Sequence, residues 1–189
     1  IEIYSATIAS FNYDDCAPHP CWFTPPEWLG NVDIGSRLHL LSNQPTSRLH
    51  SQLDHGNVSR AAKINGHEPA RINPVDAASR DIKDGDIVRL WNERGACLCG
   101  AIVSDEIMQG VLMVSTGAWF DPDYNAQTGL SCKHGNPNVL APDRGTSKLA
   151  QGPAAHSCLV DIEVWTDKWT GPNVVVTAHT PPIIIDGCK

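Results

Sequence analysis

Long apolar segments, a basic surplus and a regular cysteine framework are all absent from this chain. Its longest apolar stretches, Val174–Val176 and Ile183–Ile185, are far shorter than the roughly 18 residues of a membrane-spanning helix. These short runs make a membrane an unexpected partner. The net charge of −7 leaves no basic patch to release counterions from phosphates, so nucleic acid is not an expected partner either. The chain opens on Ile1-Glu2-Ile3-Tyr4, without a starting Met or a basic leader, so we expect a piece of a longer polypeptide.

Cysteine is present but follows no regular pattern. The seven cysteines are an odd number, whereas a secreted protein of 189 residues is expected to carry an even number. The count favours a reducing, cytoplasmic compartment, with a periplasmic enzyme as the alternative. Cysteine and histidine come close at Cys16 with His19 and Cys21, at Cys97 with Cys99, and at Cys132 with His134. None of these clusters repeats the C-x2-C spacing of a structural zinc site, so we expect no metal and assign most thiols to buried packing.

The distribution of turn residues divides the chain into three parts. Residues 1–36 hold a predicted strand at Ile1–Ile8, then prolines that exclude a long element, and a helical turn at Pro25–Gly30. We interpret this part as a connector from an upstream domain. Residues 37–169 form the main domain. Residues 170–189 form an extended, strand-like tail, and its Ile183–Ile185 is expected to pack on another domain.

The main domain is predicted to be mainly β with short helices. Apolar or alternating runs predict strands at Leu38–Leu41, Ala70–Asn73, Ile87–Trp91, Ala96–Val103, Val111–Ser115 and Cys158–Val164. Helices are predicted from Thr46 to about Asp54 and at Pro74–Arg80, where proline suits the first turn. Residues 55–68 predict a loop and Asn92–Gly95 a hairpin turn. Short strands with a few short helices indicate a closed β-barrel with helical insertions.

Polar side chains gather where the first predicted strand ends. Ser42-Asn43-Gln44 follows that strand, and Arg48-Leu49-His50-Ser51-Gln52 comes shortly after. Their amides, hydroxyls, guanidinium and imidazole suit a heterocycle with many N–H and C=O edges, together with a phosphate. Turn formation and helix capping explain the same residues without any ligand. A second polar set, Asn136–Asn138 and Gly145–Gly152, lacks the spacing of a P-loop or of G-x-G-x-x-G.

These residues resemble the last domain of the dimethyl sulfoxide reductase family, which includes trimethylamine N-oxide reductase and biotin sulfoxide reductase. The longer matching stretches are LHLLSNQP at Leu38–Pro45, RLHSQL at Arg48–Leu53, INPVDAA at Ile72–Ala78, GDIVR at Gly85–Arg89 and GTSKLAQG at Gly145–Gly152. Shorter stretches match at Glu68-Pro69, Asn92–Gly95, Gly117–Trp119, Asn138–Leu140, Tyr13–Cys16, His19-Pro20 and Glu27–Gly30. The resemblance therefore covers nearly the whole chain, with several specific motifs in order.

The resemblance implies a fold and a cofactor. Members of this family are large molybdenum enzymes with two molybdopterin guanine dinucleotides, and their last domain resembles the double-psi β-barrel of aspartate decarboxylase. It covers the cofactors from one side, next to the upstream domains of the same enzyme. By resemblance, the residues that contact one dinucleotide are Ser42, Asn43, Gln44, Arg48, His50, Ser51, Gln52, Asn138, Gln151 and His156. Amides suit the pterin and guanine edges, whereas Arg48, hydroxyls and backbone N–H groups suit the pyrophosphate.

One departure and two alternatives stay open. Where the family often has Gly-Gln, this chain has Ala155-His156, so His156 either replaces the amide donor or the contact is lost. The serine ligand of molybdenum lies upstream in the family, so we expect no catalytic residue here and an inactive fragment. One alternative function is a free-standing double-psi barrel that binds a protein or peptide partner. The other is the equivalent domain of a formate dehydrogenase or nitrate reductase relative, which differs in the upstream molybdenum ligand.

Overall fold

The computed structural model describes residues 2–31, 33, 35–124 and 129–166. The helices of this part are α1 (Ala6–Phe11), α2 (Asn57–Ala61), α3 (Pro74–Ala78) and the 3-10 helix η1 (Pro137–Val139). The strands are β1 (Leu38–Leu41), β2 (Pro69–Ile72), β3 (Ile87–Trp91), β4 (Ala96–Val103), β5 (Val111–Val114) and β6 (Leu159–Val164). No helix within the described ranges is long and apolar enough to cross a membrane.

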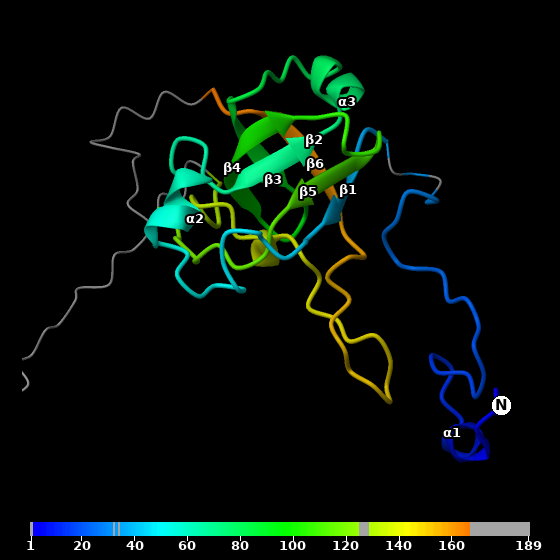
Figure 1. The fold of residues 1–189 in the computed structure, drawn as a ribbon. Helices are drawn as coiled ribbons and strands as arrows, with labels where there is room; N and C mark the ends of the chain where they lie inside the picture. The colour runs from blue at the N-terminus through cyan, green and yellow to red at the C-terminus, as the bar shows by residue number, and fades with distance from the viewer. Residues whose placement is uncertain (1, 32, 34, 125–128, 167–189) are drawn as a thin grey trace, which may run out of the picture.

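The six strands close into one barrel in the order β1-β5-β2-β4-β3-β6 (Figure 1). The pairs β1/β5 and β2/β4 are parallel, and the other pairs are antiparallel. The mainly β, double-psi barrel architecture expected from the sequence is confirmed. Because β1 and β5 are parallel and in register from His39 with Val111 onward, their carboxyl ends lie side by side. The segments that leave these two strands therefore begin at the same place on the barrel.

Alternation along the strands fills the barrel interior. Leu40, Ile72, Leu90, Leu112 and Val160 are each at most 1% exposed and belong to one core cluster. Their neighbours along each strand point outward, as the period of two requires. Burying these five aliphatic side chains stabilises the fold by about 1.5–3 kcal/mol each. This apolar core is the rigid base that carries the polar loops described below.

Residues 96–101 of β4 are buried, and the segment after residue 120 covers the outer side of the start of this strand. Ala96 and Leu98 pack there against Leu130, and Cys132 forms a β-bridge with Cys97. The amide of Ser131 donates to the carbonyl of Ala96 at 2.8 Å. Part of the long segment 120–145 is therefore a cover for the barrel wall.

Glu27 is one residue that fastens the connector to the barrel. Both carboxylate oxygens of Glu27 accept from the Arg94 guanidinium, at 2.6 and 2.9 Å. The same carboxylate accepts from the Leu159 amide at 2.7 Å, where β6 begins. Beyond this anchor the connector extends away from the barrel, with α1 near its far end (Figure 1).

The six strands predicted in the main domain are confirmed to within one residue, and so is the hairpin between β3 and β4. Helix α3 is confirmed but ends at Ala78. Pro74 opens it, and the Asn73 side chain caps it by accepting from the Val75 amide at 2.9 Å. The Pro74 ring and the Asn73 side chain both act on the first turn of the helix. Because these effects are local, the sequence predicts this helix well.

Four local predictions are wrong. The strand predicted at Ile1–Ile8 is replaced by α1, which Ser5 caps, and residues predicted as a loop contain α2. Pro25–Gly30 forms bends and a turn instead of a helical turn. The helix predicted from Thr46 is absent, because residues 46–55 form turns with positive φ at His50 and Leu53. The tail from Thr170, with Ile183–Ile185, lies outside the described residues.

Candidate functional site

The end of β1 and the end of β5 are tied together by one asparagine. The carbonyl of Asn43 accepts from the Thr116 amide at 2.9 Å, which extends the β1/β5 pairing by backbone bonding. The Asn43 side-chain oxygen accepts from the Ser115 hydroxyl at 3.0 Å, and its amide nitrogen donates to the carbonyl of Gln44. The Asn43 carbonyl and both polar atoms of its side chain are therefore hydrogen-bonded within the protein, which fixes the start of the loop that follows.

Gln44 and His50 form an exposed pair at the rim of this loop. The Gln44 side-chain nitrogen lies 3.1 Å from Nδ1 of His50. Because an amide nitrogen only donates, Nδ1 accepts and the neutral imidazole carries its proton on Nε2. Both residues are exposed. The pair therefore presents an N–H donor to whatever lies against the loop.

The backbone of this loop is strained and closely packed. His50 has a φ of 49° and Leu53 a φ of 58°, the left-handed region that costs a non-glycine residue about 1–2 kcal/mol. The turn after β5 packs directly on His50. A Cβ on Gly117, whose own φ is +89°, would lie only 2.0 Å from the His50 carbonyl oxygen. Such a conformation persists only where the surroundings over-determine it.

Those surroundings are a buried set of ionisable side chains, which we call the ion cluster: Arg48, Asp54, Lys63, Glu68 and His134. Each of these side chains is at most 3% exposed. Lys63 bridges the two acids, with Nζ at 2.7 Å from Asp54 and 2.8 Å from Glu68. Arg48 contacts Glu68 at 3.0 Å and Asp54 at 3.4 Å. The formal charges of these two acids and two bases cancel, which is the condition for burying them together.

Asp54 is the central acceptor of the ion cluster. Its carboxylate also accepts from the Trp119 amide at 2.9 Å and lies 3.1 Å from Nε2 of His134. Burial acts to raise the pKa of Asp54, but hydrogen bonds from His134, Lys63 and the Trp119 amide outweigh burial and hold that pKa well below the ordinary aspartate range. Asp54 is therefore ionised at neutral pH and joins the loop 46–56 to the two segments that carry Trp119 and His134.

The Arg48 side chain points into the protein. The predicted contact with a pyrophosphate needs an exposed guanidinium, whereas this one is 2% exposed. Its nitrogens donate to the carbonyls of His50 at 3.1 Å and Thr116 at 3.0 Å, and to the Ser59 hydroxyl at 3.2 Å. Arg48 supports the loop from within.

The other predicted residues fall into two groups. The Ser42 amide donates to Nδ1 of His156 at 3.4 Å, which brings the segment before β6 to the end of β1. Ser51 and Gln52 are exposed next to His50, and the Ser51 carbonyl accepts from the Trp119 indole at 2.7 Å. These residues form one polar row, which we define as Ser42, Asn43, Gln44, His50, Ser51, Gln52 and His156.

Asn138 and Gln151 stand apart from the polar row. Asn138 is exposed in η1, and its amide donates to the Asn136 side chain at 3.0 Å. Gln151 is exposed as well, with a φ of 52°, and its side chain donates to the Ser147 carbonyl at 2.8 Å. Among the described residues, no hydrogen bond joins either side chain to the row.

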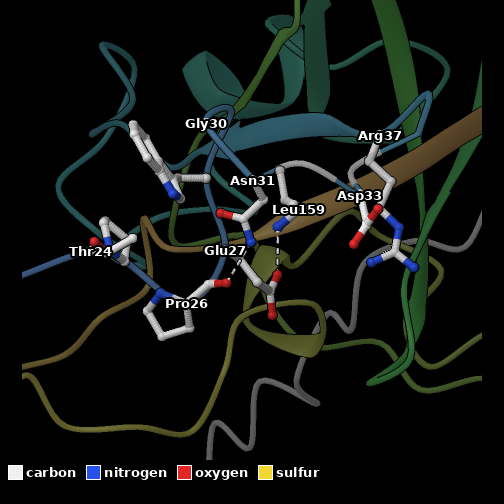
Figure 2. A pocket seen from close by; sticks show the side chains of 10 residues that line it. Thr24, Pro26, Glu27, Gly30, Asn31, Asp33, Arg37 and Leu159 are labelled. Atoms are coloured by element: carbon white, nitrogen blue, oxygen red, sulfur yellow. Dashed lines mark hydrogen bonds between the residues drawn. The ribbon is translucent and has the colours of Figure 1, made fainter.

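Two hollows lie in the described part of the chain near these segments. One, of about 250 Å³, opens beside the loop and is lined by Asn43, Thr46, Ser47 and Arg48 among others. The second, of about 510 Å³, lies between the connector and the start of β6 (Figure 2). In Figure 2 the Glu27 carboxylate reaches the Leu159 amide across the floor, while Arg37 and Asp33 stand on one side and Thr24 and Pro26 on the other.

Within the described ranges, no group of three or more His, Cys, Asp or Glu side chains could hold a metal ion. The described cysteines are free thiols, and Cys97, Cys99, Cys132 and Cys158 are buried. Burial raises the pKa of Cys158 to about 11, against the opposing effect of Arg94. These thiols act as packing groups, as predicted for most of them.

Residues 38–159 match the family described as Molydopterin dinucleotide binding domain. The chain belongs to the molybdopterin dinucleotide binding domain family. The matched range contains strands β1 to β5 and all the residues of the polar row, and it ends at Leu159, the first residue of β6. The family recognised from the sequence motifs is thereby confirmed.

Relatives of this molybdopterin dinucleotide binding domain include three kinds of reductase. The chain is 49% identical to a trimethylamine-N-oxide reductase of Salmonella typhimurium, over 97% of this chain and 21% of that protein. It is 45% identical to a dimethyl sulfoxide/trimethylamine N-oxide reductase of Cereibacter sphaeroides, over 96% and 22%. It is 50% identical to a biotin sulfoxide reductase of the same organism, over 97% and 24%. The chain thus spans between a fifth and a quarter of the length of these relatives.

A solved structure supports the fold of the domain. Acetylene hydratase from Pelobacter acetylenicus superposes with a TM-score of 0.68, over 87% of this chain and 23% of that one. At 18% sequence identity, this likeness bears on the fold alone.

Sequence reasoning missed most of the ion cluster. Asp54, Lys63, Glu68 and His134 are spread over 80 residues, and each looks like an ordinary surface group in its local context. A usable signal was Gly117-Ala118-Trp119, which matches the family motif yet carries no ionisable side chain. In this molybdopterin dinucleotide binding domain, that motif supplies the close backbone contact with His50 and the amide donor to Asp54.

Proposed function

We propose that this domain covers one face of a molybdopterin guanine dinucleotide within a longer molybdenum oxidoreductase that reduces S-oxides or N-oxides. The observation that carries the proposal is the polar row near the carboxyl ends of β1 and β5. Five of its residues, Gln44, His50, Ser51, Gln52 and His156, are exposed, and Ser42 and Asn43 are half-buried. The 45–50% identity to reductases of S-oxides and N-oxides supports the reaction class.

The chemistry of the polar row fits this cofactor. Gln44, Gln52 and the two histidines offer donors and acceptors that match the edges of a pterin or a guanine. Ser42 and Ser51 add hydroxyl groups suited to a pyrophosphate. Arg48 is withdrawn from this task by its burial, so we assign the phosphate contacts to hydroxyls and backbone N–H groups.

The cofactor and this domain have different roles in the proposed enzyme. When bound, the cofactor supplies the oxygen-atom transfer and electron chemistry, and the residues of this domain bind and orient it. Gln44 and His50 would direct hydrogen bonds at the pterin or guanine rings, and His156 would take the place of the family's glutamine. Asn138 and Gln151 would contact the cofactor at the edge of the site, supported by their exposure.

The proposed arrangement of the polypeptide keeps residues 1–36 as a connector, 37–169 as the cofactor-binding domain and 170–189 as a tail. Upstream domains of the same enzyme would supply the molybdenum ligand and the rest of the site. The isolated chain would then be inactive while retaining weak affinity for part of the cofactor.

A nucleotide titration tests the proposal. Amide chemical shifts are followed while the chain is titrated with GMP and GDP, and in parallel with AMP and ADP. We expect guanine-selective shifts, even at millimolar affinity, at Ser42–Gln44, Arg48–Gln52 and His156. An equal response to adenine and guanine, or shifts confined to other surfaces, would contradict the cofactor assignment and favour a partner-binding barrel.

A matched pair of variants sharpens the test. Gln44→Met removes the amide at the rim while keeping the length of the side chain. Gln109→Met makes the same change at an exposed turn before β5, at the opposite end of that strand. The first variant is expected to weaken the guanine-selective response and the second to leave it unchanged.

A further inference from the structure

We propose that Arg48 is a positioning residue, which holds the strained loop in the shape that the Gln44–His50 pair needs. This inference rests on the proposed function, because the loop is taken to meet the cofactor. It assigns Arg48 an indirect role in place of the direct phosphate contact expected from the sequence.

The first support is the strain at His50. A residue with a φ of 49° reverts to a commoner conformation unless its neighbours hold it. Arg48 Nε donates to the His50 carbonyl at 3.1 Å, two residues along the chain. The guanidinium thus binds the backbone of the strained residue itself.

The second support is the direction of the other donors. One terminal nitrogen of Arg48 is shared between the Thr116 carbonyl and Glu68, each at 3.0 Å. The same planar group therefore joins the loop to the turn after β5 on one side and to the buried acid on the other. An ammonium group keeps the charge but lacks the fixed fork of donors that reaches these acceptors together.

The third support is what depends on this geometry at the surface. The Gln44 side chain reaches Nδ1 of His50 at 3.1 Å in the observed loop conformation. A change in φ at His50 would redirect its imidazole and break this pair. Without this pair, the His50 imidazole would lose its preference for a proton on Nε2, and the loop would lose the N–H donor that it presents.

The experiment compares two arginine-to-lysine variants of the whole 189-residue chain. Arg48→Lys keeps the buried charge and removes the fork. Arg80→Lys is the matched control, because Arg80 also donates to backbone carbonyls, those of Asp76 and Ser36, beside α3. The readouts are the ring ¹⁵N shifts of His50, amide hydrogen exchange at Gln52 and the dissociation constant for GDP.

The proposal predicts a specific pattern for Arg48→Lys. The His50 ring signals should move from the Nε2–H tautomer toward the average of the two tautomers. Exchange at Gln52 should rise at least tenfold while the barrel strands exchange as before, and GDP affinity should fall about tenfold. Arg80→Lys should leave all three readouts unchanged. Wild-type values in Arg48→Lys, or the same loss in both variants, would overturn the proposal.

Two further outcomes keep the test decisive. If the wild-type chain does not bind GDP, the proposed function fails, and the tautomer and exchange readouts still decide the role of Arg48. If Arg48→Lys does not fold, the double variant Arg48→Met/Glu68→Gln is used instead. It removes one positive and one negative charge together, and it leaves Lys63 paired with Asp54. It is expected to show the same loss of the His50 tautomer signature, and a retained signature would refute the positioning role.

Discussion

Replacing Gly117 by alanine should separate the turn after β5 from the loop that carries His50. The new Cβ would lie 2.0 Å from the His50 carbonyl oxygen and 2.8 Å from the Ser51 nitrogen, and both are backbone atoms that cannot rotate away. One segment must retreat by about 1 Å before the closest contact reaches the 3.0 Å that real Cβ atoms keep. The perturbation therefore acts directly on the candidate site.

Two terms set the size of the effect. A non-glycine residue at a φ of +89° costs about 1–2 kcal/mol, and forcing extra volume into a packed region costs about 1–3 kcal/mol. We therefore expect Gly117→Ala to lower the free energy of unfolding by about 2–5 kcal/mol. Gly85 supplies the control, because its φ is +86° and a Cβ there would meet nothing within 4 Å. Gly85→Ala should show the φ penalty alone.

Urea unfolding followed by tryptophan fluorescence measures both variants. Gly117→Ala should be the less stable by about 1–3 kcal/mol, the part that comes from overpacking. Amide exchange should also rise at Gln52 in Gly117→Ala and stay at the wild-type rate in Gly85→Ala. Equal losses of stability in the two variants would refute the close backbone packing on which the site depends.

Three further predictions concern the core, the ion cluster and the connector. Leu112→Ala, at a position with no exposed surface, should lower the free energy of unfolding by about 2–5 kcal/mol in urea titrations, and a loss below 1 kcal/mol would contradict its place in the core. Because the folded-state pKa of Asp54 is lowered, the unfolded state binds more protons as the pH falls below about 4, so stability should fall there. Urea midpoints at pH 7 and pH 3 should show that Asp54→Asn loses less stability than the wild type as the pH falls. An equal loss in the two proteins would contradict the lowered pKa of Asp54 in the folded state. Glu27→Gln should cost about 1–2 kcal/mol and speed exchange of the Leu159 amide, because the charged acceptor of Arg94 is lost; unchanged exchange would argue against the anchor.

The barrel strands could be predicted from the sequence because their signal is local. Ile87–Trp91 alternates between buried and half-buried positions, and Asn92–Gly95 supplies the turn that leads into β4. The apolar run Leu38–Leu41 is bounded by polar residues on both sides. The closed strand order could not be read in this way, because it depends on pairings between strands far apart, such as β2 with β4.

The loop 46–56 shows where local reasoning fails. Thr46 and the residues after it have an acceptable helical pattern, yet the guanidinium of Arg48 binds the His50 carbonyl and the loop turns instead. The bonds that decide this come from Glu68 and Thr116, which lie 20 and 68 residues away from Arg48. A charged side chain therefore looks like a ligand in the sequence and is an internal support in the structure.

The polar row was recoverable from the sequence only through family motifs. Residue types alone left cofactor contacts open for Ser42–Gln44 but favoured ordinary turn chemistry. The segment with His156 comes close to Ser42 through a single backbone donor, across 114 residues of chain. Contacts between residues so far apart in the sequence carry no periodic signal, so the position of His156 beside Ser42 is seen only in the structure.

Intermolecular nuclear Overhauser effects test most directly whether the polar row contacts a guanine dinucleotide, as proposed. The chain, labelled with ¹³C and ¹⁵N, is saturated with GDP, and contacts from the guanine H8 and ribose protons are assigned. We expect contacts to side chains among Gln44–Gln52 and to His156. Contacts confined to the hollow between the connector and β6, around Trp28 and Arg37, would contradict the proposal.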